Sequence, residues 1–281
     1  MKKLLLLSAF LCIGLALNAQ PADPDATSEA KALFERLEKL QKKGTMYGHQ
    51  DDYMYGHSWK LEDDAAEFVK SDVKDVCGSY PAVFGMDLGG IELGWTHNLD
   101  RNDFDNMRAS AVAHHERGGV VTFSWHPRNP LTGGDTWDTS STEVVASILP
   151  GGEKHEMFMG WLSKAADFLE SIKTAEGDKI PVIFRPWHEH TRDWFWWGQN
   201  LCTTEQYVAL WRMTHDYMTN VRGFNHLVWS YSPDAGGLTD DNFGEKWPGD
   251  DVVDMVGIDF YQFTPADEFI AKITYENTNR V

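Results

Sequence analysis

The sequence has few cysteines and few basic residues, and both shortages restrict what the protein can be. Only three cysteines occur among 281 residues, which excludes a disulfide-stabilised scaffold. Two of them, Cys77 and Cys202, follow the first nineteen residues, and their spacing does not decide whether they pair. Lysine and arginine number 25 against 43 acidic residues, a net charge of −18 at pH 7. A chain this acidic is not expected to bind nucleic acid or anionic lipid.

Long apolar runs are also missing, except at the N-terminus. There, two lysines precede an apolar stretch from Leu4 to Leu17, and a small residue, Ala19, follows. This pattern predicts a cleaved export signal over residues 1–19, because the stretch is too short to span a bilayer comfortably. We therefore expect an exported protein, periplasmic or extracellular, with no membrane span and one catalytic domain over residues 20–281.

Two motif classes are absent as well. No Gly-rich phosphate-binding turn is present to support a nucleotide fold, and no Gly-x-Ser-x-Gly elbow is present to support an esterase. The glycine pairs at 133–134 and 151–152 flank a region of Thr, Ser and Asp. We expect this region to be a long loop over a cleft, which sets the preferred substrate length.

What the chain does have is an alternation of β-rich runs and helical patterns, without internal repeats. Helical patterns cover residues 28–43, 104–117, 156–174 and 205–221. Six buried apolar runs predict strands at residues 45–49, 82–87, 120–126, 181–189, 227–232 and 253–261. This alternation predicts a parallel sheet with helices outside it. The length fits one α/β barrel, and an open doubly wound sheet is the alternative.

The predicted strands end in polar or aromatic residues. In a parallel barrel the active site forms at the C-terminal ends of the strands, so this pattern favours a barrel rim. The residues at these ends are His49, Asp87, His126, His188, Glu189, Asp259 and Tyr261.

The strongest local signal is the run IFRPWHEH at residues 183–190, followed by WFWWG at residues 194–198. Glu189 is framed by tryptophans, where desolvation would raise its pKa and keep the carboxyl protonated near neutrality, as a proton donor requires. Arg185 shares one face of the predicted strand with Trp187 and Glu189, because alternate residues of a strand point to the same side. A rim salt bridge from Arg185 that keeps Glu189 ionised is therefore the alternative. A regular strand would put His188 and Glu189 on opposite faces, so the backbone must leave strand geometry here.

The eleven histidines raise the alternative of a metal site. His188 and His190, with His126 and Asp259 from other strand ends, could supply ligands as in barrel metallohydrolases. Histidines serve more often as hydrogen-bonding residues than as ligands. We therefore expect no metal and no cofactor.

Taken together, these motifs resemble glycoside hydrolase family 26, whose best-known members are β-mannanases. The resemblance covers nearly all of the chain after the export signal. It runs through YGHQ at 47–50, FGMD at 84–87, SWHP at 124–127, RPWHE at 185–189, WFWWG at 194–198 and GIDFY at 257–261. It implies a (β/α)₈ barrel that needs no cofactor and acts on β-mannan or manno-oligosaccharides.

The resemblance also implies roles for individual residues. Glu189 would be the acid/base, His126 and His188 would contact the sugar on the non-reducing side of cleavage, and Trp194 would stack on it. Asp259 and Tyr261 resemble the pair that binds the reacting sugar and orients the nucleophile. Each also has a structural alternative: His126 as a satisfied barrel histidine, Trp194 as a core ring, and Asp259 as a partner of Arg185.

The resemblance places the nucleophilic glutamate at the end of the seventh strand, several tens of residues past the Asp-x-Tyr strand. Only twenty residues follow Tyr261, and neither Glu268 nor Glu276 ends a buried apolar run. We therefore expect about six of eight barrel units, a nucleophile beyond Val281, and poor hydrolysis by this chain.

The predicted activity is that of a retaining endo-β-1,4-mannanase. The alternatives are a β-1,3-xylanase, a mixed-linkage glucanase, a mannobiose-releasing exo-enzyme and a non-catalytic carbohydrate-binding barrel.

Overall fold

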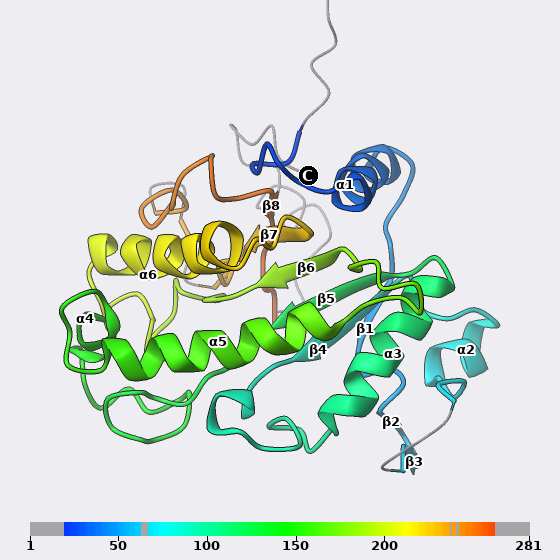
Figure 1. Ribbon diagram of the computed structural model, residues 1–281, viewed down its shortest axis with the longest axis horizontal. Coiled ribbons are helices and arrows are strands. Elements are labelled where there is room, and N and C mark those ends of the chain that lie inside the picture. Colours follow the sequence, from blue (N-terminus) through cyan, green and yellow to red (C-terminus); the bar gives the residue numbers. More distant parts are fainter. Residues whose placement is uncertain (1–19, 63–66, 237, 240–241, 262–281) are drawn as a thin grey trace, which may run out of the picture.

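The computed structural model describes residues 20–62, 67–236, 238–239 and 242–261 (Figure 1). The predicted export signal at residues 1–19 lies outside these ranges, as do Glu268 and Glu276. Within them, no helix combines the length and apolar character needed to cross a membrane. Both cysteines that follow the signal are free, Cys77 at the surface and Cys202 buried.

Six strands form one parallel sheet in the order β1-β4-β5-β6-β7-β8. Each strand therefore pairs only with its sequence neighbours within this sheet, as expected for a barrel wall. The prediction of six parallel strands is confirmed. Their bounds are Gly48–Gln50 for β1, Val83–Asp87 for β4, Val120–Ser124 for β5, Val182–Arg185 for β6, Leu227–Tyr231 for β7 and Met255–Val256 for β8.

Three helices lie along the outer face of this sheet, as Figure 1 shows: α3 (Phe104–Glu116), α5 (His155–Ser171) and α6 (Thr204–Asp216). Alternate strand residues point toward them and form the main apolar core, among them Phe84, Phe123 and Trp229. Thr203 and Gln206 form a capping box that starts α6, satisfying backbone N–H groups that would otherwise lack partners.

The first helix, α1 (Ser28–Gln41), lies apart from these three (Figure 1). Its Leu33, Phe34 and Leu37 pack against Val120, Ile183 and Val228, which sit on the opposite side of their strands from the main core. These strand residues belong to the early part of β5, β6 and β7. The helix therefore closes the inner face of the sheet at the end where the strands begin.

Several local predictions are corrected. The region after His126 is not a continuous loop, because α4 (Val144–Ile148) buries Val144, Val145 and Ile148 there. The single helix predicted for residues 205–221 ends at Asp216 and continues as a π-helical turn, η2 (Tyr217–Val221).

Four short elements between β1 and α3 were not predicted. They are α2 (Asp72–Cys77), the hairpin strands β2 (Tyr55–Gly56) and β3 (Trp59–Lys60), and the 3₁₀ turn η1 (Ile91–Leu93). Each is too short to carry a recognisable periodicity.

Candidate active site

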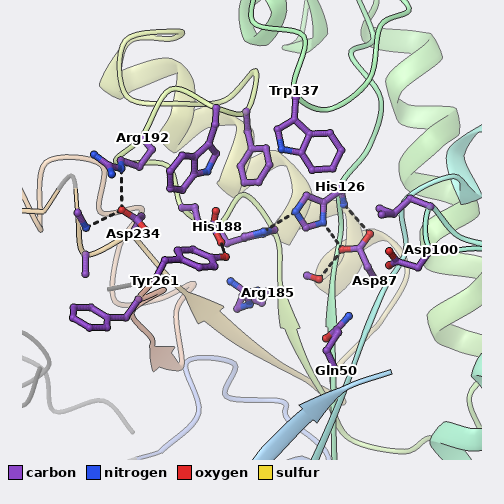
Figure 2. A pocket seen from close by; sticks show the side chains of 18 residues that line it. Gln50, Asp87, Asp100, His126, Trp137, Arg185, His188, Arg192, Asp234 and Tyr261 are labelled. Atoms are coloured by element: carbon purple, nitrogen blue, oxygen red, sulfur yellow. Dashed lines mark hydrogen bonds and ion pairs between the residues drawn. The ribbon is translucent and has the colours of Figure 1, made fainter. Parts of the chain in front are cut away.

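A cavity of about 770 Å³ opens where the C-terminal ends of the strands meet (Figure 2). Its walls come from the ends of the strands, from the loops after β4, β5, β6 and β7, and from the segment that follows β8. The lining residues are Gln50, Asp87, Leu99, Asp100, Ser124, His126, Trp137, Arg185, His188, Glu189, Arg192, Trp194, Phe195, Asp234, Ala235, Gly236, Phe260 and Tyr261. A pocket at this end of a parallel sheet is where the fold assembles active sites.

Glu189 reaches the pocket because the chain turns sharply after β6. The strand ends at Arg185, and both Trp187 and Glu189 adopt left-handed backbone conformations, with φ of 52° and 57°. Such conformations cost non-glycine residues about 1–3 kcal/mol each and cluster at functional sites. The Glu189 N–H donates to the carbonyl of Ser232 at 2.7 Å, which fastens the turn to the loop after β7. The predicted departure from strand geometry is confirmed.

The Glu189 carboxyl is 4% exposed and accepts a hydrogen bond from the Tyr261 hydroxyl at 2.5 Å. Burial raises the pKa of Glu189 above its usual value, and the negative charge of Asp259 adds to this effect. The hydrogen bond from Tyr261 and the charges of Arg185 and His126 oppose it. This is the environment that keeps a carboxyl protonated and ready to donate.

Arg185 pairs with Asp259 and not with Glu189. One guanidinium nitrogen lies 2.8 Å from each oxygen of the Asp259 carboxylate, and the Ser232 hydroxyl donates to the same group at 2.6 Å. Burial raises the pKa of Asp259 even though Arg185 and Ser232 oppose the shift. Of the two alternatives for Arg185, the structure therefore has the Asp259 pair.

Asp259 and Tyr261 do not lie on a regular strand, which corrects that part of the prediction. β8 ends at Val256, and Asp259 makes only an isolated parallel bridge with Asp234. Both side chains nevertheless reach the site, Asp259 through Arg185 and Tyr261 through Glu189.

A chain of hydrogen bonds links the ends of β4, β5 and β6. The Asp87 carboxylate lies 2.6 Å from Nδ1 of His126, and Nε2 of His126 lies 3.1 Å from Nε2 of His188 (Figure 2). His126 and His188, both predicted from the sequence, thus meet at the pocket wall. The pKa of His188 is held well below its usual value by burial, and the charges of Arg185 and His126 act in the same direction.

Aromatic rings line two sides of the pocket. Trp137 stacks on His126, with ring centroids 5.8 Å apart and an interplanar angle of 16°, and it remains 51% exposed. Trp194 meets Tyr261 edge to face at 6.2 Å, and the Arg192 guanidinium lies 5.1 Å above the Trp194 ring. Half-exposed indoles beside a polar centre suit contact with the apolar faces of sugar rings.

Two of the predicted histidines lie outside the pocket. His49 is directed toward Asp52, 3.2 Å away, while its neighbour Gln50 lines the cavity. His190 is buried between the hydroxyls of Tyr207 and Tyr231. Within the described ranges, no group of three or more His, Cys, Asp or Glu side chains has an arrangement that could hold a metal ion.

Other pocket residues were missed by the sequence reasoning. Trp137 carried a usable signal, since it is the only tryptophan in a polar segment after His126. Arg192 and Asp234, an ion pair at 3.0 Å (Figure 2), carried none, because their contact joins two loops 42 positions apart.

Comparison with known proteins identifies the family to which this pocket and fold belong. Residues 22–279 match the family model described as glycosyl hydrolase family 26. The chain belongs to this family. Solved structures of the family are (β/α)₈ barrels, and the parallel sheet with its outer helices corresponds to six barrel strands.

Individual family members are similar over most of this chain. The structure of a family 26 β-mannanase from Bacteroides ovatus is 46% identical with a TM-score of 0.81, covering 89% of this chain and 70% of that one. A mannan endo-1,4-β-mannosidase from Bifidobacterium adolescentis is 35% identical over 248 residues, which is 85% of this chain and 24% of that protein. One from Bacillus subtilis strain 168 is 29% identical, over 87% and 67% respectively. This chain thus spans about a quarter of the Bifidobacterium enzyme and about two thirds of the Bacillus enzyme.

Proposed function

We propose that this family 26 protein acts on β-1,4-linked mannan or manno-oligosaccharides as a retaining endo-mannanase. The observation that carries the proposal is Glu189: a buried carboxyl with a raised pKa, at the C-terminal end of a barrel strand and open to a pocket with aromatic walls. The similarity of the chain to β-mannanases supports mannan as the glycan.

In the proposed reaction, Glu189 gives its proton to the glycosidic oxygen as the bond from that oxygen to the anomeric carbon breaks. A second carboxylate forms an ester bond to the anomeric carbon. Glu189, now ionised, then takes a proton from water, and the hydroxide oxygen replaces the ester, giving net retention. Tyr261 holds Glu189 in place through the hydrogen bond to Oε1.

The identity of the carboxylate nucleophile stays a prediction. Three carboxylates near the pocket already have strong partners: Asp87 with His126, Asp234 with Arg192, and Asp259 with Arg185. Each of the three is already held in place by its partner, and none of them is our candidate.

We assign sugar contacts to the histidines and indoles of the pocket. His126 and His188 supply polar contacts on the non-reducing side of the cleaved bond, and Trp194 supplies a stacking face there. Trp137, which projects over His126, supplies a second face. We also propose that the protein is exported, on the basis of residues 1–19.

Two measurements on the full chain test this proposal separately. Calorimetry with manno-, xylo- and gluco-oligosaccharides tests the substrate class: selective binding of manno-oligosaccharides is expected, and a preference for either of the others would refute it. Release of reducing sugar from mannan tests the nucleophile. A rate near the enzyme median of about 10 s⁻¹ would show that the nucleophile lies within the 281 residues.

The second candidate is a carbohydrate-binding barrel without catalysis. The same pair of measurements bears on it. Binding of manno-oligosaccharides by the full chain without release of reducing sugar from mannan would favour the binding protein.

A further inference from the structure

Asp87 lies at the C-terminal end of β4, where it lines the pocket and contacts His126 (Figure 2). We propose that Asp87 is a positioning residue that fixes the protons on His126 and His188 and thereby sets the charge that faces Glu189. The assignment of the protons on the two histidines rests on the hydrogen-bond geometry around them. The expected effect on oligosaccharide binding rests on the proposed function as well.

The hydrogen bonds around Asp87 leave its carboxylate no other orientation. The side chain is 3% exposed. One oxygen lies 2.6 Å from both the Ser124 hydroxyl and His126 Nδ1, and the other accepts the N–H groups of Gly89 at 2.7 Å and of His126 at 3.3 Å. A carboxylate saturated in this way is an acceptor only. The proton between Asp87 and His126 therefore sits on Nδ1 of His126.

The contact between the two histidines completes the argument. Nε2 of His126 and Nε2 of His188 are 3.1 Å apart, so one of them must carry a proton and the other must present a lone pair. If His126 is cationic, its Nε2–H donates, and His188 is neutral with its proton on Nδ1. If His126 is neutral, its Nε2 is the acceptor, and the proton of His188 moves to Nε2. The charge of His126 thus determines the tautomer of His188.

The charges that face His126 decide between these two states. They come from Asp87 and Asp100 on the β4 side, Arg185, His188 and Glu189 on the β6 side, and Asp259 after β8. Burial alone would lower the pKa of His126, but the charge and hydrogen bond of Asp87 raise it above its usual value. At pH 6.5 and below the cationic state is therefore favoured, and the charge of His126 in turn lowers the pKa of Glu189.

The test is ¹⁵N NMR of the histidine rings in the full chain, with signals assigned from single His→Gln variants. In the wild type, His126 should titrate with a midpoint above 6.5, and His188 should stay neutral with its proton on Nδ1. Asp87→Asn keeps an acceptor for Nδ1 and removes the charge. It should lower the His126 midpoint by roughly one to three pH units and move the His188 proton to Nε2 at pH 6.5.

Two further variants separate this role from general damage to the site. Ser124→Ala removes a neighbouring hydrogen bond but keeps the Asp87 charge, and Asp100→Asn removes a nearby charge without touching His126. Both should leave the His188 tautomer unchanged. A neutral His126 in the wild type at pH 6, or the same His188 tautomer in Asp87→Asn, would overturn the proposal; the first result does not depend on the folding of Asp87→Asn.

Calorimetry connects the inference with the substrate. At pH 6.5, Asp87→Asn should weaken manno-oligosaccharide binding by about tenfold, the size of one polar contact, and Ser124→Ala by less. Equal losses in the two variants would reduce Asp87 to a packing role. If the wild type binds no manno-oligosaccharide, the proposed function fails, and the NMR result still decides the role of Asp87.

Discussion

Near their starts, β5, β6 and β7 present Val120, Ile183 and Val228 to the inside of the sheet, where the apolar face of α1 covers them. At or just past their other ends, the same strands present Ser124, Arg185 and Ser232, each bound to a carboxylate. One face of one sheet thus changes from closely packed and apolar to polar and hydrogen-bonded within about five residues. Stability and chemistry occupy opposite ends of the same strands.

The polar end also carries features that oppose folding. Trp187, Glu189 and Asp51 have left-handed backbone there, and the pKa of Asp51, which is fully buried after β1, is raised to about 7 by burial and by the charges of Asp100 and Asp87. At the apolar end, α1 and the strands form a cluster that contains no charged side chain. This α1 cluster consists of Leu33, Phe34, Leu37, Val120, Ile183 and Val228. We therefore expect substitutions at the two ends to affect different quantities.

The largest effect on the rate is expected from Glu189→Gln. An amide has nearly the same shape but donates no proton to the leaving oxygen, so whatever mannan hydrolysis the wild-type chain shows should fall by about 10²–10⁴-fold, with a smaller loss on an activated aryl mannoside. Oligosaccharide binding and the unfolding midpoint should persist. Initial rates and calorimetry measure this, with the exposed Glu143→Gln as the control; a measurable wild-type rate that Glu189→Gln leaves unchanged would refute the acid/base role.

The largest effect on stability is expected from Phe34→Ala, at the apolar end. Phe34 is fully buried in the α1 cluster, and its truncation should lower the free energy of unfolding by about 3–5 kcal/mol. Denaturant unfolding measures the loss, and Glu35→Ala, on the exposed side of the same helix, should cost under about 1 kcal/mol. A weaker oligosaccharide affinity in the folded variant would contradict the separation of the two ends.

Asp51→Asn tests whether the polar end reduces stability. The folded-state pKa is about 7 against 3.8 for the ordinary carboxyl. Between these values Asp51 binds more protons in the folded protein than in the unfolded chain, so its contribution to the free energy of unfolding should decrease as pH rises from 4 to 7. The variant, whose asparagine tolerates the left-handed φ of 54°, should lose this decrease.

At pH 8, Asp51→Asn should exceed the wild type in unfolding free energy by at most roughly 4 kcal/mol. Unfolding curves at pH 4, 6 and 8 measure the difference. The surface variant Asp75→Asn should keep the wild-type pH dependence. A parallel pH dependence in Asp51→Asn and the wild type would show that Asp51 is ionised at little cost.

The smallest effect is expected from Trp194→Ala. Removal of a stacking face should weaken manno-oligosaccharide binding by about 1–3 kcal/mol, seen by calorimetry, while cooperative unfolding persists. If cooperativity is lost and affinity per folded molecule is unchanged, Trp194 belongs to the core. In that case the apolar packing would extend as far as the wall of the pocket.

The sequence predicted all six sheet strands from apolar runs, of which β4, β5, β6 and β7 are mostly buried in the structure, but it overestimated the strand lengths. β6 was expected to reach Glu189 and ends at Arg185, directly before Pro186, which has no N–H for the ladder. His49 was expected at the rim, yet Gln50 lines the pocket. Successive strand residues face opposite sides, so an error of one residue reverses the assignment.

Much of the candidate site could be predicted, and the rest depended on loop paths. Glu189, His126, His188, Trp194 and Tyr261 all line the cavity, and Asp259 joins it through Arg185. Periodicity says nothing about where a polar segment crosses the surface. Trp137, Arg192 and Asp234 could therefore be located only from the folded chain.

The position of α1 has a consequence for the order of folding. Each sheet strand can add to the strand that precedes it in the sequence, so the wall can grow stepwise as the chain leaves the ribosome. The segment around α1 is made first but is bound last: the N–H of Thr27 pairs with the carbonyl of Asn225, and that of Ala22 with the carboxylate of Asp254. Until those partners exist, Leu33, Phe34 and Leu37 remain an uncovered apolar surface near the beginning of the nascent chain.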